Sequence, residues 1–188
     1  MKTVLFGGSF NPPTRAHIEV INYLANRPDI EKVIIIPNGD SYNYNNKNLA
    51  SFKDRVNMLN LEINSNKVFI SDIYLHSQFN GIVEVLDKLN HRIFVMGDDC
   101  LEDLFNWINP IKLISENNFI VFSRDKSILD MKKIIQNNET LKLYEDHFEL
   151  VNINTSKVSS TNLRANHKLT ETTDNIADYI KKNHLYGF

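Results

Sequence analysis

The stretch FGGSFNPPTRAH, residues 6–17, contains residue types that could bind a phosphate. A short apolar segment precedes it and apolar residues at helical spacing follow it, which predicts a strand, a loop and then a helix. Gly7 and Gly8 carry no Cβ, so the backbone there can turn tightly and approach a ligand. Thr14 can cap the helix by accepting a backbone N–H, and His17 lies in the first helical turn near the same free N–H groups. We interpret the stretch as a phosphate site; a capped turn with a half-exposed histidine is the alternative.

The stretch VSSTNLR, residues 158–164, is a second candidate of the same kind. Ser159 or Ser160 can cap the short helix expected there, which leaves the other hydroxyl and N–H groups for an anion. Arg164 lies one turn after Ser160 or Thr161, so its guanidinium can reach back and bind phosphate oxygens through two N–H groups. Alone, the stretch equally fits a capping motif with a surface arginine. Together, the two stretches predict two helix starts that converge on one triphosphate.

Both stretches need a scaffold, and strand-like and helix-like segments alternate along the chain. β-branched apolar runs predict strands at residues 2–6, 32–37, 68–70, 92–96, 119–122 and 148–153. Helical spacing predicts helices at residues 15–26, 52–64, 82–89, 128–136 and 174–183, with a short helix from Ser160. This alternation is typical of an α/β fold, here a Rossmann-like, doubly wound and mainly parallel sheet with helices on both faces. We expect one domain over residues 1–188, with residues 38–48 as its longest loop.

The composition limits the classes of protein and partner. Hydrophobic residues make up 42% of the 188 residues and charged residues 23%, which argues against disordered, collagen-like and disulfide-rich classes. A formal net charge of −2 gives no electrostatic reason to expect a nucleic acid or a membrane surface as partner. The single cysteine, Cys100, cannot form an intrachain disulfide, and the first residues show no signal-peptide pattern, so we expect a cytoplasmic protein. The sequence leaves homo-oligomer formation open.

Several motifs occur in the order of a known enzyme superfamily. GGSFNPPTRAH resembles the T/HxGH signature of the nucleotidyltransferases, and VSSTNLR resembles their ISSTxxR signature. Within that superfamily the chain is similar to nicotinate- or nicotinamide-mononucleotide adenylyltransferases, because IPNGDSYNYNNKNL, FKDRVNML and FVMGDDCLEDLFNW resemble their intermediate segments. The final DYIKKNHLYGF resembles their closing YIxxNxLY. These matches span nearly the whole chain.

The resemblance implies a set of site residues. Those expected to contact ATP are Gly8, Ser9, Phe10, Thr14, His17, Gly97, Asp99, Ser160, Thr161 and Arg164. Those expected to contact the acceptor are Lys47, Arg55, Phe79 and Trp107. His17, Arg164 and Lys47 would be catalytic through hydrogen bonding and positive charge, since this transfer needs no protein nucleophile. The implied cofactor is Mg²⁺ bound through the ATP phosphates, and no His/Cys cluster suggests a metal held by the protein.

The activity that the resemblance implies is adenylyl transfer from ATP to nicotinate mononucleotide, which gives deamido-NAD and pyrophosphate. Three alternatives stay open: nicotinamide mononucleotide as the acceptor, another phosphorylated acceptor such as phosphopantetheine, and a sensor of the same fold that binds nucleotide without turnover. For Asp99 the alternative is a helix-capping carboxylate, with Asp98 beside it, and for Trp107 it is core packing.

Three departures from the family pattern bear on these alternatives. Thr14 stands where the family has its first histidine, and Ala16 stands where the signature has glycine. Ile82 stands where a threonine usually lies near the pyridine substituent, which affects how a carboxylate is told from an amide. The loop that carries Lys47 is also longer than the pattern it resembles.

Overall fold

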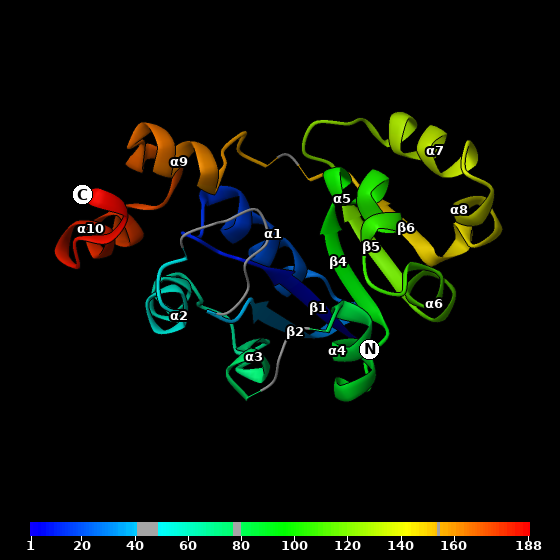
Figure 1. Cartoon of the computed structure of the whole chain (residues 1–188), viewed down its shortest axis with the longest axis horizontal. Coiled ribbons are helices and arrows are strands. Elements are labelled where there is room, and N and C mark those ends of the chain that lie inside the picture. Colours follow the sequence, from blue (N-terminus) through cyan, green and yellow to red (C-terminus); the bar gives the residue numbers. More distant parts are fainter. Residues whose placement is uncertain (41–48, 77–79, 154) are drawn as a thin grey trace.

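The structure is a computed structural model that describes residues 1–40, 49–76, 80–153 and 155–188. Within these residues, six strands form one parallel sheet in the order β3-β2-β1-β4-β5-β6 (Figure 1). The strands are β1 (Lys2–Gly8), β2 (Ile30–Pro37), β3 (Val68–Ile70), β4 (Ile93–Gly97), β5 (Asn118–Phe122) and β6 (Phe148–Val151). The direction of winding reverses between β1 and β4, which is the order of a doubly wound Rossmann-like fold and confirms the predicted fold class.

Helices cover both faces of the sheet. They are α1 (Arg15–Asn26), α2 (Phe52–Asn60), α3 (Ile73–His76), α4 (Ile82–Leu89), α5 (Asp98–Asp103), α6 (Pro110–Glu116), α7 (Ile128–Gln136), α8 (Glu139–Leu143), α9 (Ser160–Asn166) and α10 (Asp174–Lys182). Short 3-10 turns are η2 (Leu104–Asn106), η3 (Glu145–His147), η4 (Leu169–Glu171) and η5 (Leu185–Gly187). Figure 1 shows α9 and α10 at one end of the molecule, beside α1 and α2, and α5 to α8 at the other end. No helix in the described part of the chain is long and apolar enough to cross a membrane.

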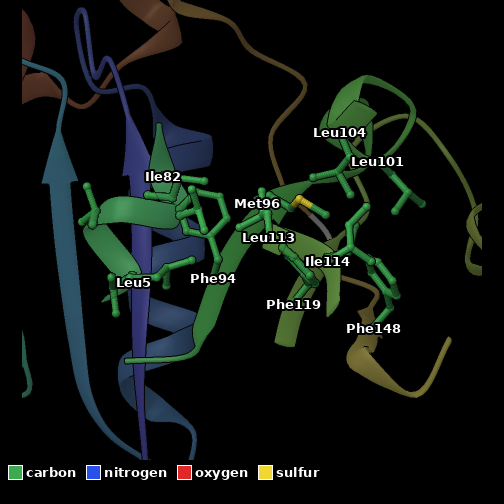
Figure 2. Close-up of a cluster of buried hydrophobic side chains, with 14 of the residues drawn as sticks. Leu5, Ile82, Phe94, Met96, Leu101, Leu104, Leu113, Ile114, Phe119 and Phe148 are labelled. Carbon is green, nitrogen blue, oxygen red and sulfur yellow. The ribbon is translucent and has the colours of Figure 1, made fainter. Parts of the chain in front are cut away.

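Alternate side chains of the strands build separate cores on the two faces. Leu5 and Phe94 pack with Ile82 of α4 on one face, in the cluster that Figure 2 shows. Val4 and Phe6 point the other way and pack against α1. Because both faces are covered, the central strands β1, β2, β4 and β5 contain continuous apolar runs instead of alternating patterns. The predicted layers are therefore present, with helices on both sides of the sheet.

A third, smaller core attaches the C-terminal segment to α2. Met58 of α2 packs with Ile176 and Ile180 of α10. Tyr186 and Phe188, in and after η5, pack partly buried against these residues. The C-terminal segment is thereby held beside α2, the helix that follows β2.

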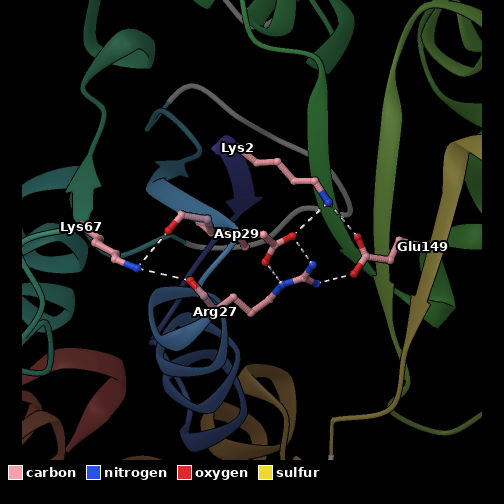
Figure 3. Close-up of polar contacts among 6 residues, drawn as sticks. Lys2, Arg27, Asp29, Lys67 and Glu149 are labelled. Carbon is pink, nitrogen blue, oxygen red and sulfur yellow. Dashed lines mark hydrogen bonds and ion pairs between the residues drawn. The ribbon is translucent and has the colours of Figure 1, made fainter.

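A group of charged side chains joins the two halves of the sheet at its amino end (Figure 3). Arg27, just after α1, donates two hydrogen bonds to Asp29, at 2.9 and 2.7 Å, and another to Glu149 of β6. Lys2 of β1 lies 3.0 Å from Asp29 and 3.6 Å from Glu149. Hydrogen bonds from Arg27 and then from Lys2 hold the pKa of Asp29 below its usual range. Lys67 donates to the Arg27 carbonyl at 3.2 Å, which completes the group.

The predicted segments agree with the structure in place and type, and differ mainly at their ends. The helix predicted over residues 52–64 ends at Asn60, and the apolar Ile63 that extended the pattern packs onto the core from the following loop. The strand predicted over residues 148–153 ends at Val151, and β1 runs on to Gly8 because it pairs with β2 up to Pro37. Four helices were missed, α3, α5, α6 and α8, which have four to seven residues each and show no full helical period.

Candidate active site

A cavity of about 990 Å³ opens at the carboxyl ends of β1, β2, β4 and β5. Its wall includes the first turns of α1, α4 and α5. This is the place where the winding of the sheet reverses, and in doubly wound folds ligands bind in the crevice formed there. The cavity is large enough for a nucleotide-sized ligand.

His17 lines this cavity from the first turn of α1, and Thr14 is the N-cap of that helix, as predicted. The Thr14 backbone N–H donates to His17 Nδ1 at 3.0 Å, and the Thr14 hydroxyl lies 2.7 Å from the same nitrogen. Because Nδ1 accepts, the neutral ring carries its proton on Nε2. Burial, and then the positive charge of Arg124, lower the pKa of His17 to about 4. His17 is therefore an uncharged N–H donor at neutral pH.

The other residues predicted from the first stretch divide into cavity wall and support. Gly8 and Ser9 line the cavity. Phe10 is fully buried, and its ring meets the ring of His17 edge to face, with the centroids 5.2 Å apart. A Cβ on Gly8 would lie 3.3 Å from the Phe10 ring, so glycine allows this close packing. Phe10 adopts a left-handed backbone with φ of 46°, and its side chain packs in the core with Phe6 and Ile18 instead of lining the cavity.

The second predicted stretch lies against the loop between β1 and α1. The Ser160 hydroxyl donates to the Pro12 carbonyl at 2.8 Å. Arg164 Nη1 donates to the Asn11 carbonyl and, at 3.1 Å, to the Ser160 carbonyl. The starts of α1 and α9 are therefore brought together, as expected. Here both side chains bind backbone carbonyls, Thr161 is exposed, and contact of the three with phosphate stays a prediction.

The choice between two capping serines at α9 is resolved by their contacts. Ser159 is the N-cap, since its hydroxyl accepts the Asn162 backbone N–H at 3.0 Å. The Ser159 backbone N–H donates in turn to the carboxylate of Glu171 at 2.9 Å. Ser159 therefore holds the helix, which leaves the Ser160 hydroxyl for the contact with Pro12.

Asp98 and Asp99 have different surroundings, which separates their roles. Asp98 is fully buried, and its Oδ2 accepts backbone N–H groups of Arg124, Asp125 and Lys126 at 2.9, 2.9 and 2.6 Å. Burial alone would raise the pKa of Asp98, but these hydrogen bonds lower it. Asp99 instead lines the cavity with its side chain 60% exposed. Asp98 thus fixes the loop after β5, and Asp99 is the carboxylate that a ligand can reach.

Gly97 allows a close approach of these groups at the end of β4. A Cβ there would overlap Asp99 Oδ1 and lie 3.2 Å from Arg124 Cδ. Any side chain at this position would therefore displace the two charged groups beside the cavity. The predicted role of Gly97 in the ATP site is consistent with this placement.

Arg124 is a cavity residue that the sequence analysis missed. It follows β5, lies 3.5 Å from Asp99 between Nη1 and Oδ2, and donates from Nη2 to the Val158 carbonyl at 3.4 Å. It also lines a second cavity of about 280 Å³ beside residues 155–159. Its place just after a strand at the carboxyl edge of a parallel sheet was the signal that could have identified it.

Trp107 lies at the part of the cavity formed by α4. Its Nε1 donates to Asp103 Oδ2 at 3.2 Å, and its ring meets Phe94 edge to face at 6.0 Å. The half-buried ring lines the cavity, as contact with an acceptor would require, and it also packs against the core, as the alternative expected. Gly81 and Ile82, at the start of α4, line the same part of the cavity.

Arg55 lies away from the cavity wall. It is fully buried, and its guanidinium donates to the Ser9 and Ala50 carbonyls, each at 2.9 Å, and pairs with Asp40 at 3.0 Å. Burial lowers the pKa of Arg55, although Asp40 acts in the opposite direction. The structure places Arg55 as a support for the loop after β1, and direct contact with an acceptor stays a prediction. The predicted Lys47 and Phe79 lie outside the described residues.

The family and its relatives agree with this geometry. The family model described as cytidylyltransferase-like matches residues 5–166. The chain is 30% identical, over 87% of its length and 86% of the relative's, to a probable nicotinate-nucleotide adenylyltransferase of Fusobacterium nucleatum subsp. nucleatum. It is also similar to Plasmodium falciparum nicotinic acid mononucleotide adenylyltransferase, in solved complexes with NaAD (26% identity) and with APC (25% identity). Both have a TM-score of 0.80 and cover 100% of this chain and 98% of the other. The chain therefore belongs to the cytidylyltransferase-like family and, within it, to the nicotinate-nucleotide adenylyltransferases.

Proposed function

We propose that the protein transfers the adenylyl group of ATP to nicotinate mononucleotide, giving deamido-NAD and pyrophosphate. The observation that carries the proposal is the cavity at the switch point of the sheet, with His17 on its wall. The hydrogen bond from Ser160 to the Pro12 carbonyl joins the start of α9 to the loop before α1. Membership of the nicotinate-nucleotide adenylyltransferases supports the choice of both substrates.

The reaction needs positioned charge and no protein nucleophile. A phosphate oxygen of the mononucleotide forms a bond to the α-phosphorus of ATP, and the bond from that phosphorus to the bridging oxygen breaks to release pyrophosphate. His17 would donate its Nε2 proton in a hydrogen bond to the phosphates, where charge builds up in the transition state. Burial raises the pKa of Cys100 to about 12, so this cavity residue is a neutral thiol and an unsuitable nucleophile.

ATP would extend across Arg124. Arg124 lines both cavities, so its guanidinium can contact the phosphates of a nucleotide whose adenine lies beside residues 155–159. The exposed Asp99 carboxylate would accept hydrogen bonds from the ribose hydroxyls. Arg164 would bind phosphate with guanidinium nitrogens other than Nη1, which donates to the Asn11 and Ser160 carbonyls, and Lys47 would add a further positive charge.

The acceptor ring would stack on Trp107. The N-terminus of α4, at Gly81 and Ile82, faces the same part of the cavity and carries the positive end of the helix dipole. This end favours a carboxylate over a neutral amide, which supports nicotinate as the substituent even though Ile82 brings no hydroxyl. Gly81 has a φ of 96°, and a Cβ there would lie 2.8 Å from Ile108 Cβ, so the turn is shaped by glycine.

The side chains that could act as metal ligands indicate how Mg²⁺ would be bound. Among the residues that the structure describes, no three His, Cys, Asp or Glu side chains form a group that could hold a metal ion. Mg²⁺ would therefore be carried by the ATP phosphates. A cytoplasmic location is part of the same proposal.

The test offers ATP together with nicotinate mononucleotide, nicotinamide mononucleotide or phosphopantetheine and measures pyrophosphate release. We expect the fastest release with nicotinate mononucleotide, and a fall in kcat of about 100-fold or more in His17→Ala. A faster rate with another acceptor would contradict the acceptor assignment. Binding of ATP without release in any mixture would identify a nucleotide sensor instead of an enzyme.

A further inference from the structure

The last turn of the chain reaches the loop between β1 and α1. Tyr186, in η5, donates its hydroxyl hydrogen to Asn11 Oδ1 at 2.9 Å, across 175 positions of sequence. Its backbone has φ of 59° and ψ of 21°, a left-handed conformation that non-glycine residues rarely adopt. His184 is also left-handed, with φ of 52°. Such a conformation persists only where surrounding contacts hold it, and for Tyr186 the core around Met58 supplies those contacts.

Asn11 receives contacts from three separate segments. Its Oδ1 accepts the Ala50 backbone N–H at 2.9 Å in addition to the Tyr186 hydroxyl. Its own carbonyl accepts from Arg164. Asn11 is fully buried, so each of these contacts replaces one that water would otherwise make. Its position is therefore set by the C-terminal segment as well as by the loop itself.

The position of Asn11 is passed on to His17 through a stiff segment. Pro12 and Pro13 follow Asn11, and their rings fix φ, so few backbone torsions separate Asn11 from Thr14. The peptide plane between Pro13 and Thr14 is bound on both sides. Its oxygen accepts from the Thr172 hydroxyl at 2.7 Å, and its N–H donates to His17 Nδ1 at 3.0 Å. Since that N–H sets which ring nitrogen of His17 carries the proton, the loop controls the donor that faces the cavity.

We propose that Tyr186 is a positioning residue, whose hydroxyl holds Asn11 and, through the two prolines, keeps the Thr14 N–H on His17 Nδ1. The inference rests on the proposed function for its effect on turnover, and on the structure alone for its effect on the histidine ring. Tyr186 is not among the residues that line the two cavities, so it would act through Asn11 and Thr14.

The experiment compares Tyr186→Phe with Tyr179→Phe. Tyr179 is a matched control, because it lies in the same small core but its hydroxyl donates to Asp54 at 2.9 Å and accepts from Asn57 at 2.9 Å, away from the loop. We expect both variants to lose a similar amount of thermal stability. In Tyr186→Phe, kcat should fall about five-fold with little change in KM for the mononucleotide, and Tyr179→Phe should keep the wild-type values.

A spectroscopic readout separates this inference from the proposed function. The ¹⁵N shifts of His17 in the full chain should show a single tautomer protonated on Nε2 in the wild type and in Tyr179→Phe, and a mixture of tautomers in Tyr186→Phe. Wild-type protein that releases no pyrophosphate would contradict the proposed function and leave this comparison valid. Unchanged His17 shifts in Tyr186→Phe, or equal changes in both variants, would overturn the inference.

A double-mutant cycle tests the route through Asn11. If the hydroxyl acts through this side chain, Tyr186→Phe should add no further loss of kcat in an Asn11→Ala background. A full five-fold additional loss in that background would overturn the route. The comparison of Tyr186→Phe with Tyr179→Phe decides the inference even where Asn11→Ala does not fold.

Discussion

The Ser160 hydroxyl donates a hydrogen bond to the Pro12 carbonyl at 2.8 Å, and 148 positions of sequence separate the two residues. One such bond contributes about 1 kcal/mol, which is small beside the entropy of bringing distant segments together, so the cores on both faces of the sheet must hold the segments in place. The value of the contact is geometric. It holds the start of α9 beside the loop that leads into α1, which is the arrangement that the proposed triphosphate site requires.

The stability of the folded state should depend on pH through His17. Its pKa is about 4 in the folded protein and near 6.5 when unfolded, so the unfolded chain binds the proton first as the pH falls. Stability should therefore decrease from pH 6.5 down to about 4, by roughly 3 kcal/mol, and show no further loss from this group below that. Urea unfolding at a series of pH values measures the slope, and His17→Ala should lack it.

Arg124→Gln provides the control for that slope. Removing the positive charge that contributes to the low pKa of His17 should raise this pKa and reduce the loss of stability between pH 6.5 and 4. Arg92→Gln, which alters an exposed pair with Asp87, should leave the slope unchanged. Equal slopes in wild type and Arg124→Gln would contradict an electrostatic contact between Arg124 and His17.

Asp98→Asn and Asp99→Asn should affect different properties, although the residues are neighbours: the first should lower stability and the second should weaken ATP binding. Asp98→Asn weakens the acceptor of three backbone N–H groups and should cost about 3 kcal/mol of unfolding free energy. Asp99→Asn should leave stability within about 0.5 kcal/mol and raise KM for ATP roughly ten-fold. Chemical denaturation and initial rates at varied ATP measure the two effects. A large loss of stability in Asp99→Asn would show that its carboxylate supports the fold.

Trp107→Ala should affect the acceptor more than ATP. Loss of the ring removes the surface on which the pyridine would stack, so KM for the mononucleotide should rise roughly ten-fold with little change in KM for ATP. Trp107→Phe, which keeps a smaller aromatic face, should lie between the wild type and Trp107→Ala. If both KM values rose equally, the ring would be acting through the packing against Phe94.

Asp29→Asn should weaken the amino end of the sheet without altering catalysis. Because its side chain is 39% exposed, the loss of its bonds to Arg27 and Lys2 should cost at most about 1 kcal/mol at pH 7. The pKa of Asp29 is lowered in the folded state, so its contribution is present above the unfolded pKa near 4 and is lost as the pH falls below it. Denaturation of wild type and variant should therefore converge in acid, with Asp178→Asn, at an exposed pair 3.9 Å from Lys181, as the unchanged control.

The sheet and its main helices could be predicted because their signals are local. Residues 33–36 of β2 and 119–122 of β5 are continuous apolar runs, and α1 and α10 show apolar residues at helical spacing. The long-range arrangement follows from rules on parallel connections, so the fold class was within reach of the sequence. The short α5 and α6 were not, because six or seven residues give too few turns for a period to show.

Residues of the candidate site could be predicted only where the relevant residue types occur close together in one stretch of the sequence. His17 and Thr14 lie together in one stretch, and the structure places Thr14 at the N-cap of α1, where its backbone N–H donates to His17 Nδ1. The distinction between Asp98 and Asp99 depends on where the loop after β5 returns, and no local pattern carries that information. Arg55 and Ser160 show a related limit: the sequence predicts ligand contacts for them, but their side chains bind carbonyls of the loop between β1 and α1.

Trp107 is the only tryptophan of the chain, and its ring lines the large cavity beside Phe94. Its fluorescence emission is therefore a built-in reporter of cavity occupancy, with no second indole to add background. Titrating the unlabelled protein with a pyridine mononucleotide should quench this emission, so binding can be followed optically before any turnover takes place.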